Sequence, residues 1–153
     1  METLERILAQ HPFLKNLEQK YVQLLVGCAV NVRFEAGSFI FREGEDANRF
    51  YILRAGRVAV EIHNGGREAI TIETLGEGDV LGWSWLVPPY KCHADAQAVE
   101  LTRAIALDGK CIRDKCQSDP SLGYELMMRI VPLITHQLQA TQLQLMDVYG
   151  VKK

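Results

Sequence analysis

The sequence predicts a small, mainly β domain of the barrel or jelly-roll kind, with helices at both ends. Nine of its twelve glycines lie between Gly27 and Gly82. The same stretch carries short runs of β-branched and aromatic residues, whereas both ends of the chain have apolar residues at helical spacing. Many short strands between glycine turns are typical of such a β roll. We expect one domain over residues 1–153, with helices at 3–28, a β roll at 30–108 and a C-terminal helix at 119–148.

Two short helices are predicted before the β roll. The first has its apolar residues on one face around Leu4–Leu8, and it should end at His11, because the residue before a proline is kept out of the α region. A second helix is expected over about residues 18–28, where apolar side chains recur every three to four positions. Each helix therefore carries an apolar face.

The strands of the β roll are predicted from alternating apolar and polar residues. Residues 58–63 and 70–73 alternate in this way, and Asn64-Gly65-Gly66 lies between them. An Asn-Gly pair between two alternating segments is typical of a β-hairpin with a type I′ turn. Further strands are expected at 32–34, 39–41, 50–53, 94–99 and 103–107, with turns at Gly37, Gly44, Gly56 and Gly78.

The last third of the chain predicts a long helix. Asp119 supplies an N-cap and Pro120 a proline at the first helical position. A seam then recurs at alternating steps of four and three residues, and it consists of Met127, Val131, Ile134, Leu138, Thr141, Leu145 and Val148. Because this spacing is typical of a helix that packs along another helix, we expect a homodimer; the alternative is that the seam folds back on its own roll. Pro132 is expected to kink the helix or to divide it in two.

Composition narrows the classes of function. The 153 residues are 48% hydrophobic and 24% charged, and the net charge of −2 lacks the basic excess with which many DNA-binding proteins neutralise phosphates. No apolar run approaches the roughly 20 residues of a membrane span, and no basic head precedes an apolar stretch as in a secretory signal. We therefore expect a cytoplasmic protein that does not contact a membrane, with its four cysteines as reduced thiols.

Three blocks in the middle of the chain resemble a known pattern. They are Gly37-Ser38-Phe39-Ile40-Phe41-Arg42-Glu43-Gly44, Phe50-Tyr51-Ile52-Leu53-Arg54-Ala55-Gly56-Arg57-Val58 and Leu75-Gly76-Glu77-Gly78-Asp79-Val80-Leu81-Gly82. The blocks and their spacing are similar to those of the cyclic nucleotide-binding domain of the Crp/Fnr family, and the likeness runs from about His11 to Val148. The resemblance implies a double-stranded β-helix jelly roll with N-terminal helices and a long C-terminal dimerisation helix.

The resemblance also implies where a ligand binds. In the family, a short helix after the glycine at position 82 offers backbone N–H groups to a cyclic phosphate. A Glu at the next position binds the ribose, and an Arg in an Arg-Ser/Thr-Ala motif pairs with the phosphate. Here Trp83 stands at the Glu position. If Ala94 is the alanine of the motif, Cys92 stands at the Arg position and His93 at the Ser/Thr position.

This departure changes which ligand is expected. The resemblance implies cyclic AMP or cyclic GMP, but neither ribose nor phosphate has its usual partner unless a shift of the loop brings Lys91 to the place of the missing Arg. Aromatic residues and prolines in the segment indicate a pocket reshaped for a flatter, more apolar or differently charged ligand; alternatively, the two tryptophans fill the pocket and close it. The candidate ligand-binding residues are Gly82, Trp83, Ser84, Trp85, Lys91, Cys92 and His93, with Thr141 and Gln142 of the C-terminal helix, where family members contact the base across the dimer.

No catalytic or metal-binding motif is found in the sequence. It has no Gly-x-Ser-x-Gly elbow, no Walker loop and no His-x-His pair of the kind that jelly-roll metal enzymes use. Its cysteines lack the Cys-x-x-Cys spacing of structural metal sites. We therefore expect neither an enzyme nor a metal protein; the remaining alternative is a zinc or haem site that includes Cys92 and His93.

The sequence thus predicts a non-catalytic, homodimeric regulatory module that senses a ligand through residues 78–94 and offers a surface to a protein partner. The alternative is a dimeric protein-interaction scaffold with a closed pocket. In Crp/Fnr regulators the long helix leads into a domain that reads DNA. Here the chain ends at Lys153, so we expect no direct DNA binding.

Overall fold

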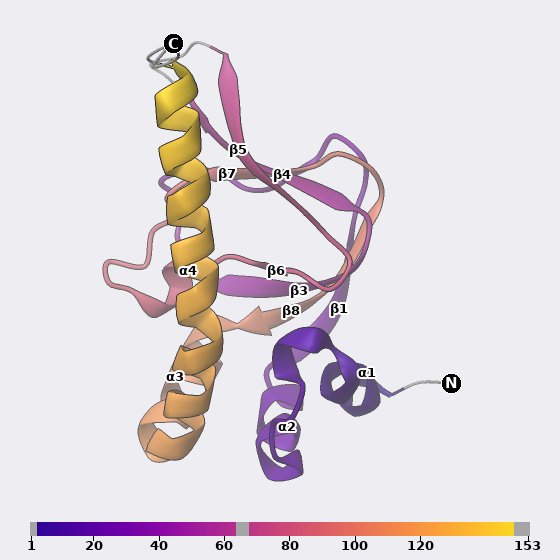
Figure 1. Cartoon of the computed structure of the whole chain (residues 1–153). Helices are drawn as coiled ribbons and strands as arrows, with labels where there is room; N and C mark the ends of the chain where they lie inside the picture. The colour runs from indigo at the N-terminus through magenta and orange to yellow at the C-terminus, as the bar shows by residue number, and fades with distance from the viewer. Residues whose placement is uncertain (1–2, 64–67, 149–153) are drawn as a thin grey trace.

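Two facing antiparallel sheets form the body of the protein, in a computed structural model that describes residues 3–63 and 68–148. Figure 1 shows α4 standing beside both sheets, with α1 and α2 near β1 and β8. The elements, in chain order, are α1 (Leu4–Gln10), the short 3-10 helix η1 (Pro12–Leu14), α2 (Gln19–Val26), β1 (Ala29–Phe34), β2 (Phe39–Phe41), β3 (Arg49–Ala55), β4 (Arg57–His63), β5 (Ala69–Gly76), β6 (Val80–Leu81), the 3-10 helix η2 (Ser84–Leu86), β7 (Asp95–Ala98), β8 (Thr102–Asp108), α3 (Gly109–Ser118) and α4 (Pro120–Val148).

The sheets confirm the predicted jelly-roll fold. One has the strand order β1-β8-β3-β6 and the other β2-β7-β4-β5, so each joins strands from distant parts of the chain. The predicted hairpin is β4 paired with β5, in which Ile62 lies opposite Ile70. Its predicted turn at residues 64–66 lies outside the described residues.

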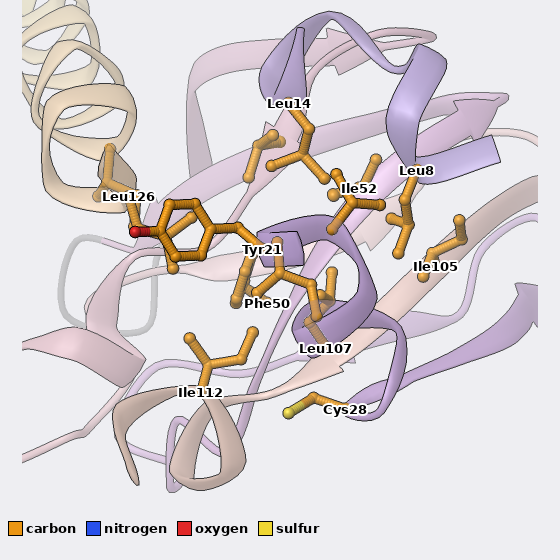
Figure 2. Packing of buried hydrophobic residues seen from close by; sticks show 14 of the residues in the cluster. Leu8, Leu14, Tyr21, Cys28, Phe50, Ile52, Ile105, Leu107, Ile112 and Leu126 are labelled. Atoms are coloured by element: carbon orange, nitrogen blue, oxygen red, sulfur yellow. The ribbon is translucent and has the colours of Figure 1, made fainter. Parts of the chain in front are cut away.

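The larger core cluster joins the N-terminal helices to the first sheet. Figure 2 shows Leu8 and Leu14 packing above Ile52 and Ile105. These four side chains are at most 1% exposed. Since burying such a side chain stabilises the fold by about 1.5–3 kcal/mol, the apolar face predicted for the first helix is what holds it to the sheet.

Helix α4 has one buried face and one exposed apolar face. Leu122, Leu126 and Ile130 are at most 2% exposed, because they pack into the larger core cluster. The predicted seam lies on another side, where Met127 and Leu138 are 44% and 56% exposed. Val131 and Leu145 of the seam are exposed as well, whereas Ile134 packs against the larger core cluster, so only part of the seam faces away from the roll.

Pro132 lies inside α4 and does not divide it. The helix is continuous from Pro120 to Val148, so the expectation of a division into two helices is wrong. A proline removes one backbone hydrogen bond and crowds the preceding turn. Ile130 packs into the core and Leu133 lines a cavity, so α4 is anchored to the body of the protein on both sides of Pro132.

The cysteines differ from the sequence expectation. Cys28 and Cys111 form a disulfide with their Cα atoms 5.8 Å apart, whereas Cys92 and Cys116 are free, so the expectation of reduced thiols is wrong for the first pair. The reason is the sheet register. Because Ala29 at the start of β1 lies opposite Leu107 near the end of β8, the residues just outside these two positions are neighbours. Helix α3, which the sequence analysis did not predict, then brings Cys111 back toward Cys28.

In the described part of the chain, no helix is long and apolar enough to span a membrane.

Candidate functional site

A cavity of about 370 Å³ lies between the second sheet, the segment after β6 and α4. We call residues 82–93, the segment between β6 and β7, the cassette; it leaves the sheets as a loop beside α4 (Figure 1). The apolar part of the cavity wall includes Val60 and Leu75 from the sheet and Pro132 and Leu133 from α4. One cavity is therefore bounded by both the roll and the long helix.

Trp83 connects the cassette to α4. Its indole stacks on the ring of His93, with the ring centres 4.8 Å apart and the planes 19° apart. Its Nε1–H donates a hydrogen bond to Oε1 of Gln137 in α4. The hydroxyl of Ser84 in turn lies 2.9 Å from Nδ1 of His93. Three cassette side chains and one from α4 thus form a continuous polar and aromatic wall.

Two carboxylates face the same cavity. Glu73 of β5 has a side chain only 13% exposed, and its Oε1 lies 3.2 Å from Nδ1 of His136 in α4. Burial raises the pKa of Glu73, and the hydrogen bond from His136 lowers it only in part. Asp79, in the turn before β6, accepts a hydrogen bond of 2.8 Å from the backbone N–H of Gly76. Among the described residues that line the cavity there is no lysine and no arginine.

The structure brings four of the predicted ligand-binding residues to this cavity. They are Gly82, Trp83, Ser84 and His93. Gly82 has a φ of 97°, a left-handed conformation that glycine adopts without strain, and it turns the chain out of β6 into the cassette. Trp83 and His93, which stand where the family pattern has Glu and Ser/Thr, are therefore both part of the cavity wall.

Trp85, Lys91 and Cys92 do not line the cavity. Trp85 is 1% exposed and stacks on Phe50 in the core, with ring centres 4.7 Å apart. Lys91 extends away and donates a hydrogen bond of 2.5 Å to Asp46. The shift that would bring Lys91 to the place of the missing arginine is absent from this structure.

Cys92 is held by its backbone in a bridge between two loops. Its carbonyl accepts from the N–H of Gly44, and its own N–H donates to the carbonyl of Glu45. Burial, followed by the nearby carboxylates of Glu45 and Asp46, raises the pKa of the Cys92 thiol to about 11. The thiol of the free Cys92 therefore stays protonated near neutral pH. Within 3–63 and 68–148, no group of three histidine, cysteine or acidic side chains is placed to hold a metal ion.

Thr141 and Gln142 lie on α4 beyond the cavity. Thr141 donates a hydrogen bond of 2.8 Å to the carbonyl of Gln137, one turn earlier, and Gln142 is exposed. Neither lines the cavity within this chain. Their predicted contact with a ligand across a dimer stays a prediction.

Sequence reasoning missed the parts of the wall that come from outside the cassette. From the sequence, Glu73 belongs only to an alternating strand segment and Asp79 only to a glycine-rich turn, and Gln137 is not singled out. A signal was available for Gln137 and His136. If the seam of α4 faces away from the roll, the residues on its other side must cover the roll, and polar residues there indicate a site.

Comparison with known proteins identifies the family. The sequence model of the family described as "cyclic nucleotide-binding domain" matches residues 31–119, which include the whole cassette and most of the β roll. The chain belongs to this family. The matched residues also include the strands that line the cavity.

Known relatives agree with this assignment. A CRP-like cAMP-activated global transcriptional regulator of Mycobacterium tuberculosis is 24% identical over 147 residues, covering 95% of this chain and 63% of the regulator. The chain thus spans less than two thirds of that relative's length. A cyclic nucleotide-binding domain from Methylobacillus flagellatus has the same fold, with a TM-score of 0.76, 16% identity, and coverage of 94% of this chain and 81% of that one.

A third relative differs in its described ligand dependence. It is the regulatory subunit of a cAMP-independent protein kinase A from Trypanosoma brucei, solved as a mutant bound to cAMP. Its TM-score is 0.72 at 22% identity, and the match covers 94% of this chain and 50% of that one. At these identities, the two structural similarities show a shared fold.

Proposed function

We propose that this cyclic nucleotide-binding domain is a non-catalytic regulatory module that senses a small ligand in the cavity beside α4. Residues 3–148 act as one unit, a homodimer forms through the seam of α4, and a protein partner reads the state of the dimer. The observation that carries the proposal is the hydrogen bond from Trp83 to Gln137, because it joins the cassette to the long helix at the cavity wall. The proposal places the protein in the cytoplasm and involves neither DNA nor a membrane.

An open cavity supports sensing over the closed-pocket scaffold. Of the two tryptophans that might have filled the pocket, Trp85 packs on Phe50 in the core and Trp83 forms a wall. A cavity of about 370 Å³ remains between Trp83, the sheets and α4. This is within the size range of small-molecule pockets, which are concave and largely apolar with a few polar groups.

Cyclic AMP and cyclic GMP are not expected to bind in the usual pose. Trp83 replaces the Glu that would hold the ribose, and neither Cys92 nor Lys91 offers a positive charge to the cavity. The trypanosome relative, described as cAMP-independent, supports the idea that this fold can serve regulation without cAMP.

A second copy of this chain is the proposed occupant of the α4 seam. Met127, Val131, Leu138 and Leu145 are 44–56% exposed at heptad spacing, although they are large and apolar. A heptad seam is complementary to itself, so two copies related by a twofold axis would bury it along its length. Since α4 also forms a wall of the cavity, a ligand that moves α4 would change the dimer, provided that it binds the two arrangements with different affinity.

A thermal-shift screen with two matched alanine-to-leucine variants tests this function. Cyclic AMP, cyclic GMP and a panel of nucleosides and small heterocycles are added to the wild-type protein, to Ala94→Leu and to Ala69→Leu. Ala94 lines the cavity and is 5% exposed, so leucine there projects into the space, whereas Ala69 is exposed on β5 and gains the same atoms outside it. Ligand at 100 times its Kd stabilises the folded state by about 2.7 kcal/mol, a shift of several degrees.

Sensing predicts at least one compound that raises the unfolding temperature of wild type and Ala69→Leu but not of Ala94→Leu. If no compound discriminates between the two variants, the scaffold is the better account. Micromolar binding of cyclic AMP that is lost in Lys91→Ala would instead mean that Lys91 replaces the missing arginine after all.

A further inference from the structure

We infer that the cavity takes a flat ligand without negative charge, which donates hydrogen bonds to Glu73 and Asp79. The inference rests on the proposed function, since it names the chemical class of ligand for the same cavity. It is carried by the placement of charged side chains around that cavity and by the aromatic wall of the cassette.

The charged groups at the cavity favour a donor over an anion. Glu73 and Asp79 line it, and both are hydrogen-bond acceptors when ionised. The imidazoles of His93 and His136 are the basic side chains that line it in the described part of the chain, and Ser84 and Glu73 already occupy their Nδ1 atoms. A cyclic phosphate in this cavity would lie beside two carboxylates and without a guanidinium or ammonium partner.

The lysine of the cassette and an arginine that contacts the cassette both have other partners. Lys91 pairs with Asp46 on the outside of the roll. Arg113 of α3 donates to the backbone carbonyl of Trp85, and its guanidinium lies 4.0 Å from the centre of the Tyr90 ring. Bringing either cation into the cavity would break these contacts, so the cassette is built without a phosphate-binding charge.

The aromatic wall sets the shape of the ligand. Trp83 and His93 are stacked nearly parallel, 19° apart, and both line the cavity. A planar ring stacks favourably on such a surface, and the stacking depends more on the planarity of the ring than on which heteroatoms it contains. Donor groups on the rim of the same ring then reach the carboxylates. Aromatic amines, amidines and nucleosides without phosphate have this combination.

Two pairs of probes that differ in charge test the inference. Benzamidine and benzoate share a flat ring but carry opposite charges, and adenosine and cyclic AMP share the base and ribose but differ in the phosphate. Each is titrated into the full chain by calorimetry and by ligand-observed NMR. We expect benzamidine and adenosine to bind at least tenfold more tightly than benzoate and cyclic AMP, and Ala94→Leu to abolish their binding.

Glu73→Gln identifies the carboxylate that is responsible. This variant should bind benzamidine at least fivefold more weakly than wild type. Glu77→Gln, the same change on an exposed turn outside the cavity, should bind benzamidine as tightly as wild type does. Tighter binding of the anionic probe in either pair, lost in Ala94→Leu, overturns the inference and leaves the sensing function standing. Silence of all four probes at millimolar concentration overturns the inference, and the thermal-shift screen of the wider panel then decides whether the sensing function stands.

Discussion

Gly56→Ala is expected to leave the protein without a stable fold. Gly56 connects β3 to β4 with a φ of 103°, and a Cβ at this position would lie 2.5 Å from the carbonyl oxygen of Leu101 and 2.6 Å from the Cα of Thr102. The neighbouring atoms are mainly backbone at the start of β8, and Thr102 is fully buried, so they have no room to move. We expect the free energy of unfolding to fall by more than about 4 kcal/mol, which is most of the stability of a domain at the lower end of the usual range of roughly 5–15 kcal/mol.

Gly37→Ala is the matched control. Its φ of 89° is also left-handed, but no atom lies within 4 Å of the added Cβ. The free energy of unfolding should therefore fall by only about 1–2 kcal/mol, which is the cost of a left-handed backbone at a residue with a Cβ. Soluble yield and thermal unfolding by circular dichroism compare the two. If Gly56→Ala unfolds cooperatively within a few degrees of Gly37→Ala, the close approach of β8 to this turn is not a constraint.

Leu138→Glu is expected to convert the proposed dimer to a monomer of 17.3 kDa. Leu138 is 56% exposed and occupies the middle of the seam. In a symmetric pair of helices, the substitution buries two carboxylates in one apolar interface, which costs several kcal/mol and should raise the dimer dissociation constant more than 100-fold. Sedimentation velocity measures the mass, and circular dichroism should show the fold of each chain unchanged.

Leu143→Glu separates this effect from a general effect of charge on α4. Leu143 is 65% exposed but lies off the seam, five residues from Leu138. It should remain dimeric. A wild-type protein that is monomeric at all concentrations, or two variants that behave alike, would contradict the assignment of the seam to a second copy.

Local sequence signals predicted most of the β roll. The turns expected at Gly37, Gly44, Gly56 and Gly78 all have positive φ, a backbone conformation that favours glycine. The β4–β5 hairpin was read from alternation, which directly reflects the period of a strand. Each of these features depends on a few neighbouring residues, so one sequence suffices to find it.

Features that depend on distant segments were not predictable in the same way. The Cys28–Cys111 disulfide joins positions 83 residues apart, and only the β1–β8 register brings them together. Trp83 and Trp85 looked equivalent, yet the 3-10 turn of η2 directs one into the cavity wall and the other onto Phe50. The carboxylate of Glu73 becomes part of the site only because α4 lies over β5.

The central claim is that the cassette and the long helix are physically coupled at the cavity, and amide hydrogen exchange of Trp83→Phe tests it most directly. Phenylalanine keeps an aromatic ring in the wall but removes the N–H that Gln137 accepts. Trp85→Phe is the control, because the indole N–H of Trp85 has no hydrogen-bond partner among the described residues. Peptides covering residues 133–141 of α4 are compared with wild type by mass spectrometry, since local opening is what exchange reports.

We predict that the amides of residues 133–141 exchange at least severalfold faster in Trp83→Phe than in wild type. In Trp85→Phe, exchange in this segment should change no more than exchange in the rest of the chain does. Equal exchange of this segment in Trp83→Phe and wild type would contradict the account, because the hydrogen bond from Trp83 would then not stabilise α4.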